Sequence, residues 1–197
     1  MSHLTRIISY ATPAGVRTIA DDDGDLDRHR FWSGPQLEHP EKSTTYLDVA
    51  GLSDSKDPKT EQNLVIDAEL KQEPALIMEL GRVIETAVLK LKKGVTEDQM
   101  WEQQEAVNEI LDTATGCHGY ASGFRVSETS TDSGQYSEFV ILVAWDSLES
   151  HTSWAEKEKE KPDSPLKGYH KLVEKGEMWH VTLTYGYLSA AATAAME

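Results

Sequence analysis

The sequence has little cysteine, no long apolar run and few positive charges. Its one cysteine, Cys117, excludes an intrachain disulfide and a cysteine-based zinc cluster, and it suits a reducing compartment. The longest uninterrupted apolar run, Phe139 to Trp145, is far too short to span a bilayer. The amino terminus has neither a basic start nor an apolar signal core. We therefore expect a cytoplasmic protein with no membrane partner.

Positive charge is scarce. The sequence has 19 lysines and arginines and 34 aspartates and glutamates, which gives a formal net charge of −15. Phosphate binding needs clustered lysine and arginine, so the composition argues against a nucleic-acid partner. Hydrophobic residues make up 39% of the 197 residues, which is enough to build a core. The length fits one domain of ordinary size, or two small ones.

Several motifs that carry chemistry are also missing from the sequence. It has no Gly-Xaa-Ser-Xaa-Gly elbow, no phosphate-cradling glycine loop, no Gly-Xaa-Gly-Xaa-Xaa-Gly and no His-Glu-Xaa-Xaa-His. We therefore expect no cofactor and no metal. A haem group needs only one axial histidine, so haem stays open as an alternative.

Residues 83 to 188 show a clear succession of elements. Thr96 to Gln99 fits a capping box, and apolar residues recur at helical spacing from Met100 to Ala114, before Gly116 ends the helix. The other expected elements are strands at 83–91, 117–126, 138–145 and 178–187 and helical segments at 148–157 and 166–174. The order β-α-β-β-α-β predicts an α+β, ferredoxin-like unit.

Residues 1 to 82 give weaker signals. Strands are expected at 7–10 and 44–49, and the short apolar runs 64–66 and 76–78 are of uncertain type. Residues 6–10 resemble residues 82–86, so this part is either an extension or a degenerate first ferredoxin-like repeat. We divide the chain into this part (1–82), the ferredoxin-like α+β barrel domain (83–188) and a small-residue tail (189–197).

Three segments carry a resemblance to a known family: Lys92 to Val95, the strand Phe139 to Trp145, and Asp146 to His151, which opens a helix. Together they resemble the antibiotic biosynthesis monooxygenase family of the dimeric α+β barrel superfamily, over residues 83 to 186. The resemblance implies a four-stranded sheet whose free face pairs with a second sheet. We expect a homodimer to supply that second sheet, although residues 1 to 82 are the alternative.

Alternation in the strand 117–126 places His118, Tyr120 and Phe124 on one face and small residues on the other. We expect the small face to pack on helices and the other face to line the barrel as a small-molecule pocket. His118 and His180 are candidate acids or bases, and Tyr120 is a candidate hydrogen-bond donor. For all three, an ordinary core or surface role is the alternative.

Further aromatic residues and a histidine are expected to bind the substrate. They are Phe124, Trp145, His151, Trp154 and Tyr169. His151 lies near the expected start of a helix, where its charged form is disfavoured, so a neutral, buried, structural histidine is the alternative. Trp145 is equally consistent with a core position.

The sequence favours a cofactor-independent enzyme of natural-product, or secondary, metabolism that acts on an apolar small molecule. The chemistry expected is acid–base cyclisation, isomerisation or dehydration (a lyase reaction). A cofactor-free monooxygenase acting on a phenolic substrate is one alternative. A non-catalytic dimeric ligand-binding or stress-response barrel is the other, since fold alone does not choose among these functions.

Overall fold

The computed structural model describes residues 3–11, 31–39, 42–48, 64–126 and 137–186. The strands in this part are β1 (His3–Ala11), β2 (Phe31–Pro35), β3 (Lys42–Asp48), β4 (Leu64–Leu70), β5 (Val83–Leu91), β6 (Cys117–Arg125), β7 (Glu138–Trp145), β8 (Val173–Thr182) and β9 (Thr184–Gly186). The helices are α1 (Pro74–Leu80), α2 (Glu97–Leu111), α3 (Leu148–Glu160), the 3-10 turn η3 (Pro165–Gly168) and α4 (Tyr169–Leu172). The α+β class is confirmed.

Local sequence signals fix where the two long helices begin. The Thr96 hydroxyl accepts a hydrogen bond from the Gln99 backbone at 3.3 Å, and the Gln99 side chain accepts one from the Thr96 backbone at 3.0 Å. The predicted capping box therefore starts α2. Ser147 caps α3 in the simpler way, because its hydroxyl accepts from the Ser150 backbone at 3.1 Å.

The sheet contains the same strand order twice. Its strands run β8-β5-β7-β6-β4-β1-β3-β2-β9, with every named pair antiparallel. We call residues 1–82 the first half and residues 83–188 the second half. In the second half, β8-β5-β7-β6 places the fourth strand next to the first, then the third and the second. In the first half, β4-β1-β3-β2 follows the same order. The first half thus repeats the strand order of the second half, and its origin as a degenerate ferredoxin-like repeat stays a prediction.

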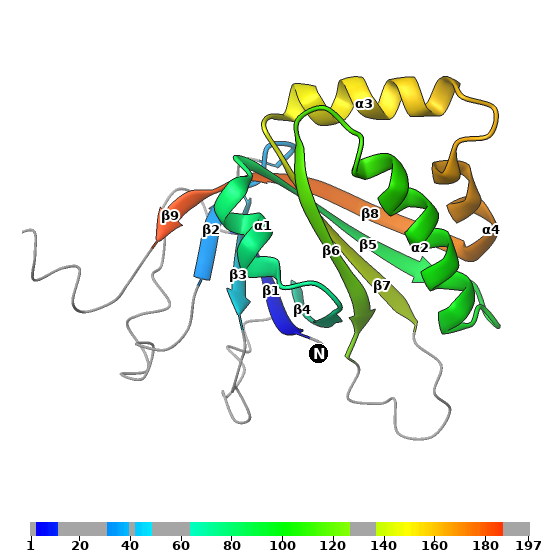
Figure 1. The fold of residues 1–197 in the computed structure, drawn as a ribbon. Helices are drawn as coiled ribbons and strands as arrows, with labels where there is room; N and C mark the ends of the chain where they lie inside the picture. The colour runs from blue at the N-terminus through cyan, green and yellow to red at the C-terminus, as the bar shows by residue number, and fades with distance from the viewer. Residues whose placement is uncertain (1–2, 12–30, 40–41, 49–63, 127–136, 187–197) are drawn as a thin grey trace, which may run out of the picture.

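The two edges of this sheet meet within one chain (Figure 1). Strand β9 follows β8 almost directly and pairs with β2 at the far edge. Gln36, just after β2, forms a bridge with Val181 of β8, and the Leu37 backbone donates to the His180 carbonyl at 2.8 Å. The first half therefore supplies the second sheet that we expected from another copy of the chain.

This closure removes the reason for which we expected a homodimer. The barrel face of β5–β8 is covered by Ile7, Ile66 and Leu70, all of which are at most 1% exposed. A dimer built on some other surface stays a prediction. It is not needed to complete the barrel.

Two apolar cores lie on opposite faces of β5–β8. The barrel core joins residues of both halves, among them Leu70, Leu142 and Val181. The helix-side core lies under α2, α3 and α4, which all cover the same face in Figure 1, and it includes Met100, Val107 and Val143.

The expected assignment of the β6 faces is wrong. Ala121 belongs to the barrel core, whereas Tyr120 and Phe124 pack in the helix-side core. The small residues are needed on the barrel side because a Cβ at Gly123 would lie 1.8 Å from the Glu69 carbonyl oxygen of β4. Glycine in a strand commonly marks such a close backbone approach.

Some expected boundaries also differ. The helical segment 166–174 ends at Leu172, and the last strand begins at Val173 instead of Met178. Residues 174–178 are exposed in this strand, so they lack the apolar alternation by which strands are recognised. The run at 64–66 is part of β4, the run at 76–78 is part of α1, and the tail 189–197 lies outside the described residues. In the described part, no helix is long and apolar enough to cross a membrane.

Candidate active site

A cavity of about 310 Å³ lies between the helices and the outer face of β5–β8. We call it the helix-side cavity. Ala87, Leu89 and Val143 form part of its floor, and Val107 and Leu111 of α2 form part of its roof. This volume is at the lower end of the ~300–1,000 Å³ typical of small-molecule sites. We expected the pocket inside the barrel, whereas this cavity lies on the opposite face of the same sheet.

The periodicity of β5 places one acidic residue in this cavity. Side chains alternate along a strand, so Glu85 shares the outer face with Ala87 and Leu89, while Ile84 lies in the barrel core. The Glu85 side chain is only 13% exposed. The indole nitrogen of Trp145 donates a hydrogen bond to Glu85 Oε2 at 2.9 Å. Burial raises the pKa of Glu85 above its ordinary value, and the Trp145 hydrogen bond offsets part of that rise.

His151 faces Glu85 from the first turn of α3. Its Nε2 lies 3.4 Å from Glu85 Oε2, and its side chain is 8% exposed. Burial, with smaller contributions from His180 and Lys159, lowers the pKa of His151 to about 4. His151 is therefore a neutral, buried imidazole at physiological pH, as its position near the start of a helix suggested.

His180 connects His151 to the first half of the chain. Its Nε2 lies 2.7 Å from His151 Nδ1, and its Nδ1 is hydrogen-bonded to the Glu38 carboxylate. The backbone nitrogen of His180 also donates to Glu38 Oε2 at 2.8 Å. Partial burial on its own would raise the pKa of Glu38, but these two hydrogen bonds, together with a hydrogen bond to the backbone of Glu38 itself and the charge interaction with His180, hold the pKa below its ordinary value.

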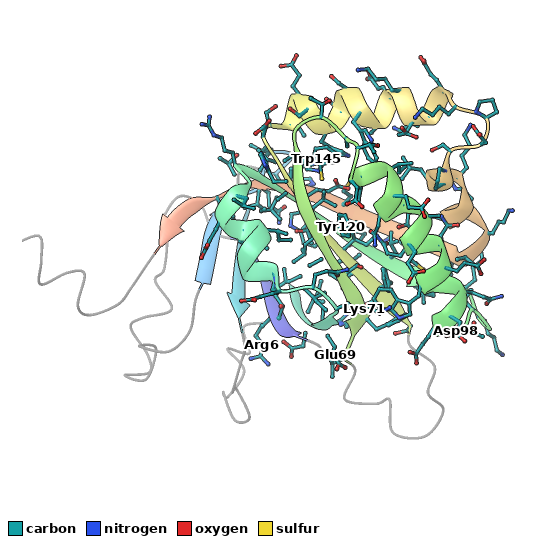
Figure 2. The ribbon with its side chains drawn as sticks, in the orientation of Figure 1. Arg6, Glu69, Lys71, Asp98, Tyr120 and Trp145 are labelled. Atoms are coloured by element: carbon teal, nitrogen blue, oxygen red, sulfur yellow. The ribbon has the colours of Figure 1, made fainter. Side chains whose placement is uncertain are left out.

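Aromatic rings hold the His151 imidazole in place. The Trp145 ring centroid lies 5.2 Å from that of His151 and 5.3 Å from that of Trp154. His151 and Trp154 line the helix-side cavity, whereas Trp145 lies behind Glu85 and is fully buried. In Figure 2, Trp145 is labelled below α3.

Tyr169 of α4 lines the cavity as well. Its hydroxyl donates to Gln104 Oε1 of α2 at 2.6 Å, and burial raises the pKa of this phenol. Gln104 is itself fully buried and donates to Asn108 at 2.8 Å. Tyr169 is therefore a neutral hydrogen-bonding group in an otherwise apolar part of the wall.

The structure does not bring the three predicted catalytic residues together. His118 is exposed and pairs with Asp146 at 2.6 Å. Tyr120 lies beside α2 in Figure 2, where burial and the neighbouring Asp112 raise its pKa to about 12. Neither residue lines the helix-side cavity, and only His180 is joined to it, through His151.

Among the predicted substrate-binding residues, His151, Trp154 and Tyr169 line the cavity. Phe124 does not, because its ring packs edge-on against Trp101 and Phe139, with centroids 5.6 and 4.9 Å away. The aromatic ring is used there to fill the layer between β6 and α2.

Sequence reasoning missed Glu85 and Glu38. Glu85 had a signal, because it is an acidic residue within the otherwise apolar start of a strand, Val83 to Leu89, where burying a charge is costly without a partner. Glu38 had no such signal in the sequence, since it lies 142 residues away from its partner His180.

Glu85, His151 and His180 each place one possible metal-binding atom within 4.8 Å of the others. Two nitrogens bound to one tetrahedral zinc at about 2.0–2.1 Å would lie about 3.4 Å apart. The 2.7 Å between His180 Nε2 and His151 Nδ1 is shorter than this and is a hydrogen-bond distance. The arrangement fits a shared proton better than a shared ion, and the absence of a metal and of any cofactor stays a prediction.

Comparison with known proteins places the fold. No family model and no curated protein matches the sequence. The structure is similar to that of an anthrone oxidase-like protein, with a TM-score of 0.61 and 9% identity over 94% of this chain and 92% of that one. It is also similar to that of a proposed monooxygenase from Lactobacillus acidophilus, with a TM-score of 0.51 and 11% identity over 93% of this chain and 94% of that one. Both likenesses span nearly the whole of this chain, and at these identities they show a shared fold.

Proposed function

We propose that this protein is an enzyme that moves a proton on an apolar, ring-shaped small molecule bound in the helix-side cavity. Glu85 and His151 would be the catalytic residues. The observation that carries the proposal is that these two groups face each other at 3.4 Å in an apolar cavity while their pKa values are displaced in opposite directions. Neighbouring titratable groups with displaced pKa values in a cavity are candidates for an acid and a base.

The proposed reaction uses one proton at a time and returns the site to its starting state. His151 Nε2 takes a proton from a carbon or hydroxyl of the substrate, and the acid form of Glu85 gives one to another atom of the same molecule. The proton on His151 then passes to Glu85 across the 3.4 Å contact. No oxidant is consumed, so the products are an isomer, a cyclised molecule or a dehydrated molecule and water.

The walls limit the substrate to one that is largely apolar. Trp154 and Leu111 offer flat or aliphatic surface, and Tyr169 offers one hydrogen-bonding hydroxyl. The exposed lining residues Thr152 and Lys159 indicate the side from which a molecule enters.

A second candidate is cofactor-free oxygenation of a phenolic substrate, which the whole-chain likeness to an anthrone oxidase-like protein and a proposed monooxygenase favours. Here His151 would take the proton that makes the substrate electron-rich. One atom of molecular oxygen would then replace the two hydrogens of a ring CH₂ to give C=O, and the other atom would leave with those hydrogens as water, which balances atoms and electrons. The same residues serve both candidates, and only the second consumes oxygen.

Anthrone, a tricyclic carbon acid, separates the candidates with one probe. Under nitrogen in D₂O, both candidates predict faster deuterium incorporation at the CH₂ group of anthrone than in buffer, because in both His151 takes a proton from the substrate. In air, the second predicts oxygen uptake and formation of the quinone. Binding is followed independently by quenching of the tryptophan emission, because Trp154 lines the cavity. Binding with neither acceleration would favour a non-catalytic binding protein.

Variants then test the two residues. Because general acid–base groups contribute about 10²- to 10⁴-fold, Glu85→Gln and His151→Gln should each lower the rate by that order. His118→Ala is the matched control, since His118 is an exposed histidine outside the cavity, and it should keep the full rate. Circular dichroism shows whether each variant stays folded. A folded His151→Gln protein with the wild-type rate would contradict the proposal.

A further inference from the structure

We infer that Glu38 and His180 are positioning residues that fix the ring tautomer of His151, so that its Nε2 carries a free lone pair toward Glu85 and the helix-side cavity. The catalytic meaning of this inference rests on the proposed function, but the tautomer itself does not. The inference also assigns the first half of the chain a part in the site of the second half.

Glu38 is held against β8 by the way the barrel closes. Gln36 bridges to Val181, and the Leu37 backbone donates to the His180 carbonyl at 2.8 Å. The next residue, Glu38, then accepts from both the backbone nitrogen and the ring Nδ1 of His180. The backbone pairing therefore sets the position of the Glu38 carboxylate, which is also 36% exposed to solvent.

With both imidazoles neutral, counting donors and acceptors along this chain of contacts gives one consistent arrangement. An ionised carboxylate only accepts hydrogen bonds, so His180 Nδ1 carries a hydrogen. In a neutral imidazole the other nitrogen is then an acceptor, so His180 Nε2 accepts from His151 Nδ1 across the 2.7 Å contact. The remaining nitrogen of His151, Nε2, has no hydrogen and lies 3.4 Å from Glu85.

Burial favours a neutral His151, and the charges around the two rings act in both directions. Glu38 faces His180 from the segment after β2, Glu85 faces His151 from β5, and Lys159 of α3 adds a positive charge near His151. Burial and Lys159 both disfavour a charged His151 at rest. When His151 takes a proton from a substrate, the negative charge of Glu38 lies two hydrogen bonds away and stabilises the product.

The tautomers are read directly from long-range ¹H–¹⁵N correlations of the histidine rings in the full-length, uniformly ¹⁵N-labelled protein at pH 7.5. The sequence has seven histidines, and His151→Gln and His180→Gln assign the two signals. We expect both rings to be neutral with the hydrogen on Nδ1. A wild-type His151 with its hydrogen on Nε2 overturns the inference, and this measurement needs no substrate.

Two variants test whether Glu38 is the cause. Glu38→Ala removes the acceptor, so both rings should shift toward the Nε2-hydrogen form, whereas Glu38→Gln keeps an amide oxygen and should preserve the wild-type tautomers. Glu149→Ala is the matched control, because it removes an exposed carboxylate from the same helix as His151. Unchanged tautomers in Glu38→Ala overturn the inference. If Glu38→Ala does not fold, the wild-type spectrum alone decides.

The activity readout separates this inference from the proposed function. If both hold, anthrone exchange should fall by about tenfold or more in Glu38→Ala and recover in Glu38→Gln. If the tautomers behave as expected but the wild-type protein does not accelerate exchange, the positioning stands and the proposed function fails. If Glu38→Ala shifts the tautomers and keeps the full rate, the positioning role in catalysis is overturned.

Discussion

The two halves of the molecule share a strand order but not a layer structure. In the described residues, the first half contributes strands β1–β4 and the short helix α1, whereas the second half carries α2, α3 and α4 over one sheet face. The helix-side cavity lies under those three helices. The second half thus builds the cavity, whereas the first half covers the barrel face and supplies Glu38.

This comparison shows that a shared strand order does not require a shared site. Strand pairing depends on backbone hydrogen bonds, which many sequences can make, so β1–β4 keep the sheet order. A pocket needs particular side chains on a helix and on the strand below it. Those side chains, Glu85 and His151, are found in the second half.

Breaking the shared barrel core gives the largest expected effect. Leu70 of the first half and Leu142 of the second are both fully buried in it. Leu70→Ala and Leu142→Ala should each lower the free energy of unfolding by about 2–5 kcal/mol, because each leaves a cavity. Urea denaturation measures both. Leu80→Ala is the control, since Leu80 is 60% exposed and should change little. If Leu70→Ala behaved like Leu80→Ala, the halves would not share one core.

Lowering the pH tests the part of the second half that forms the site, because it charges the buried His151 imidazole. The pKa of His151 is lowered from 6.5 to about 4 by folding, so the unfolded chain takes up a proton first as pH falls. The folded state should therefore lose up to about 3 kcal/mol between pH 6.5 and 4. Glu85 acts in the opposite direction, because its pKa is raised. The loss of unfolding free energy that is due to His151 is therefore measured in the Glu85→Gln variant, which lacks the opposing contribution of Glu85. Urea denaturation at several pH values gives this free energy.

The second variant Glu85→Gln/His151→Phe is the control for that measurement. Without an imidazole at position 151, the pH-dependent loss should disappear. Equal slopes in the two variants between pH 6.5 and 4 would show that His151 is not the group responsible.

Much of the second half could be predicted from the sequence, and the reasons are local. The capping box at Thr96 and the apolar run at Phe139 to Trp145 depend only on neighbouring residues. Strand β2 was missed because Gly34 and Pro35 favour a turn. The start of β8 was missed because its first half is exposed.

The site was harder to predict because it depends on contacts between distant residues. His151 and His180 were both candidates, yet nothing in the sequence showed that their rings meet at 2.7 Å. The small residues of β6 pointed to a close approach, but we expected a helix to make it. The neighbour that makes it is β4, which lies in the first half.

Removing metal should have the smallest effect. We expect purified protein to be colourless and EDTA to leave both the melting temperature and anthrone exchange unchanged, because His151 and His180 share a proton at a distance too short for a common ion. Absorption spectra and metal analysis check this. A haem Soret band, or one zinc per chain whose removal lowers the melting temperature, would contradict it.

The most direct test of the central claim is where the proton of the Glu85–His151 pair lies. Carboxyl ¹³C chemical shifts followed through a pH titration, with Glu85→Gln to assign the signal, report the ionisation of Glu85. The account predicts that Glu85 ionises above its ordinary pKa of 4.5, while the His151 ring stays neutral down to a pKa of about 4. A Glu85 that ionises at or below 4.5, beside a His151 that is already charged at pH 6, would contradict it.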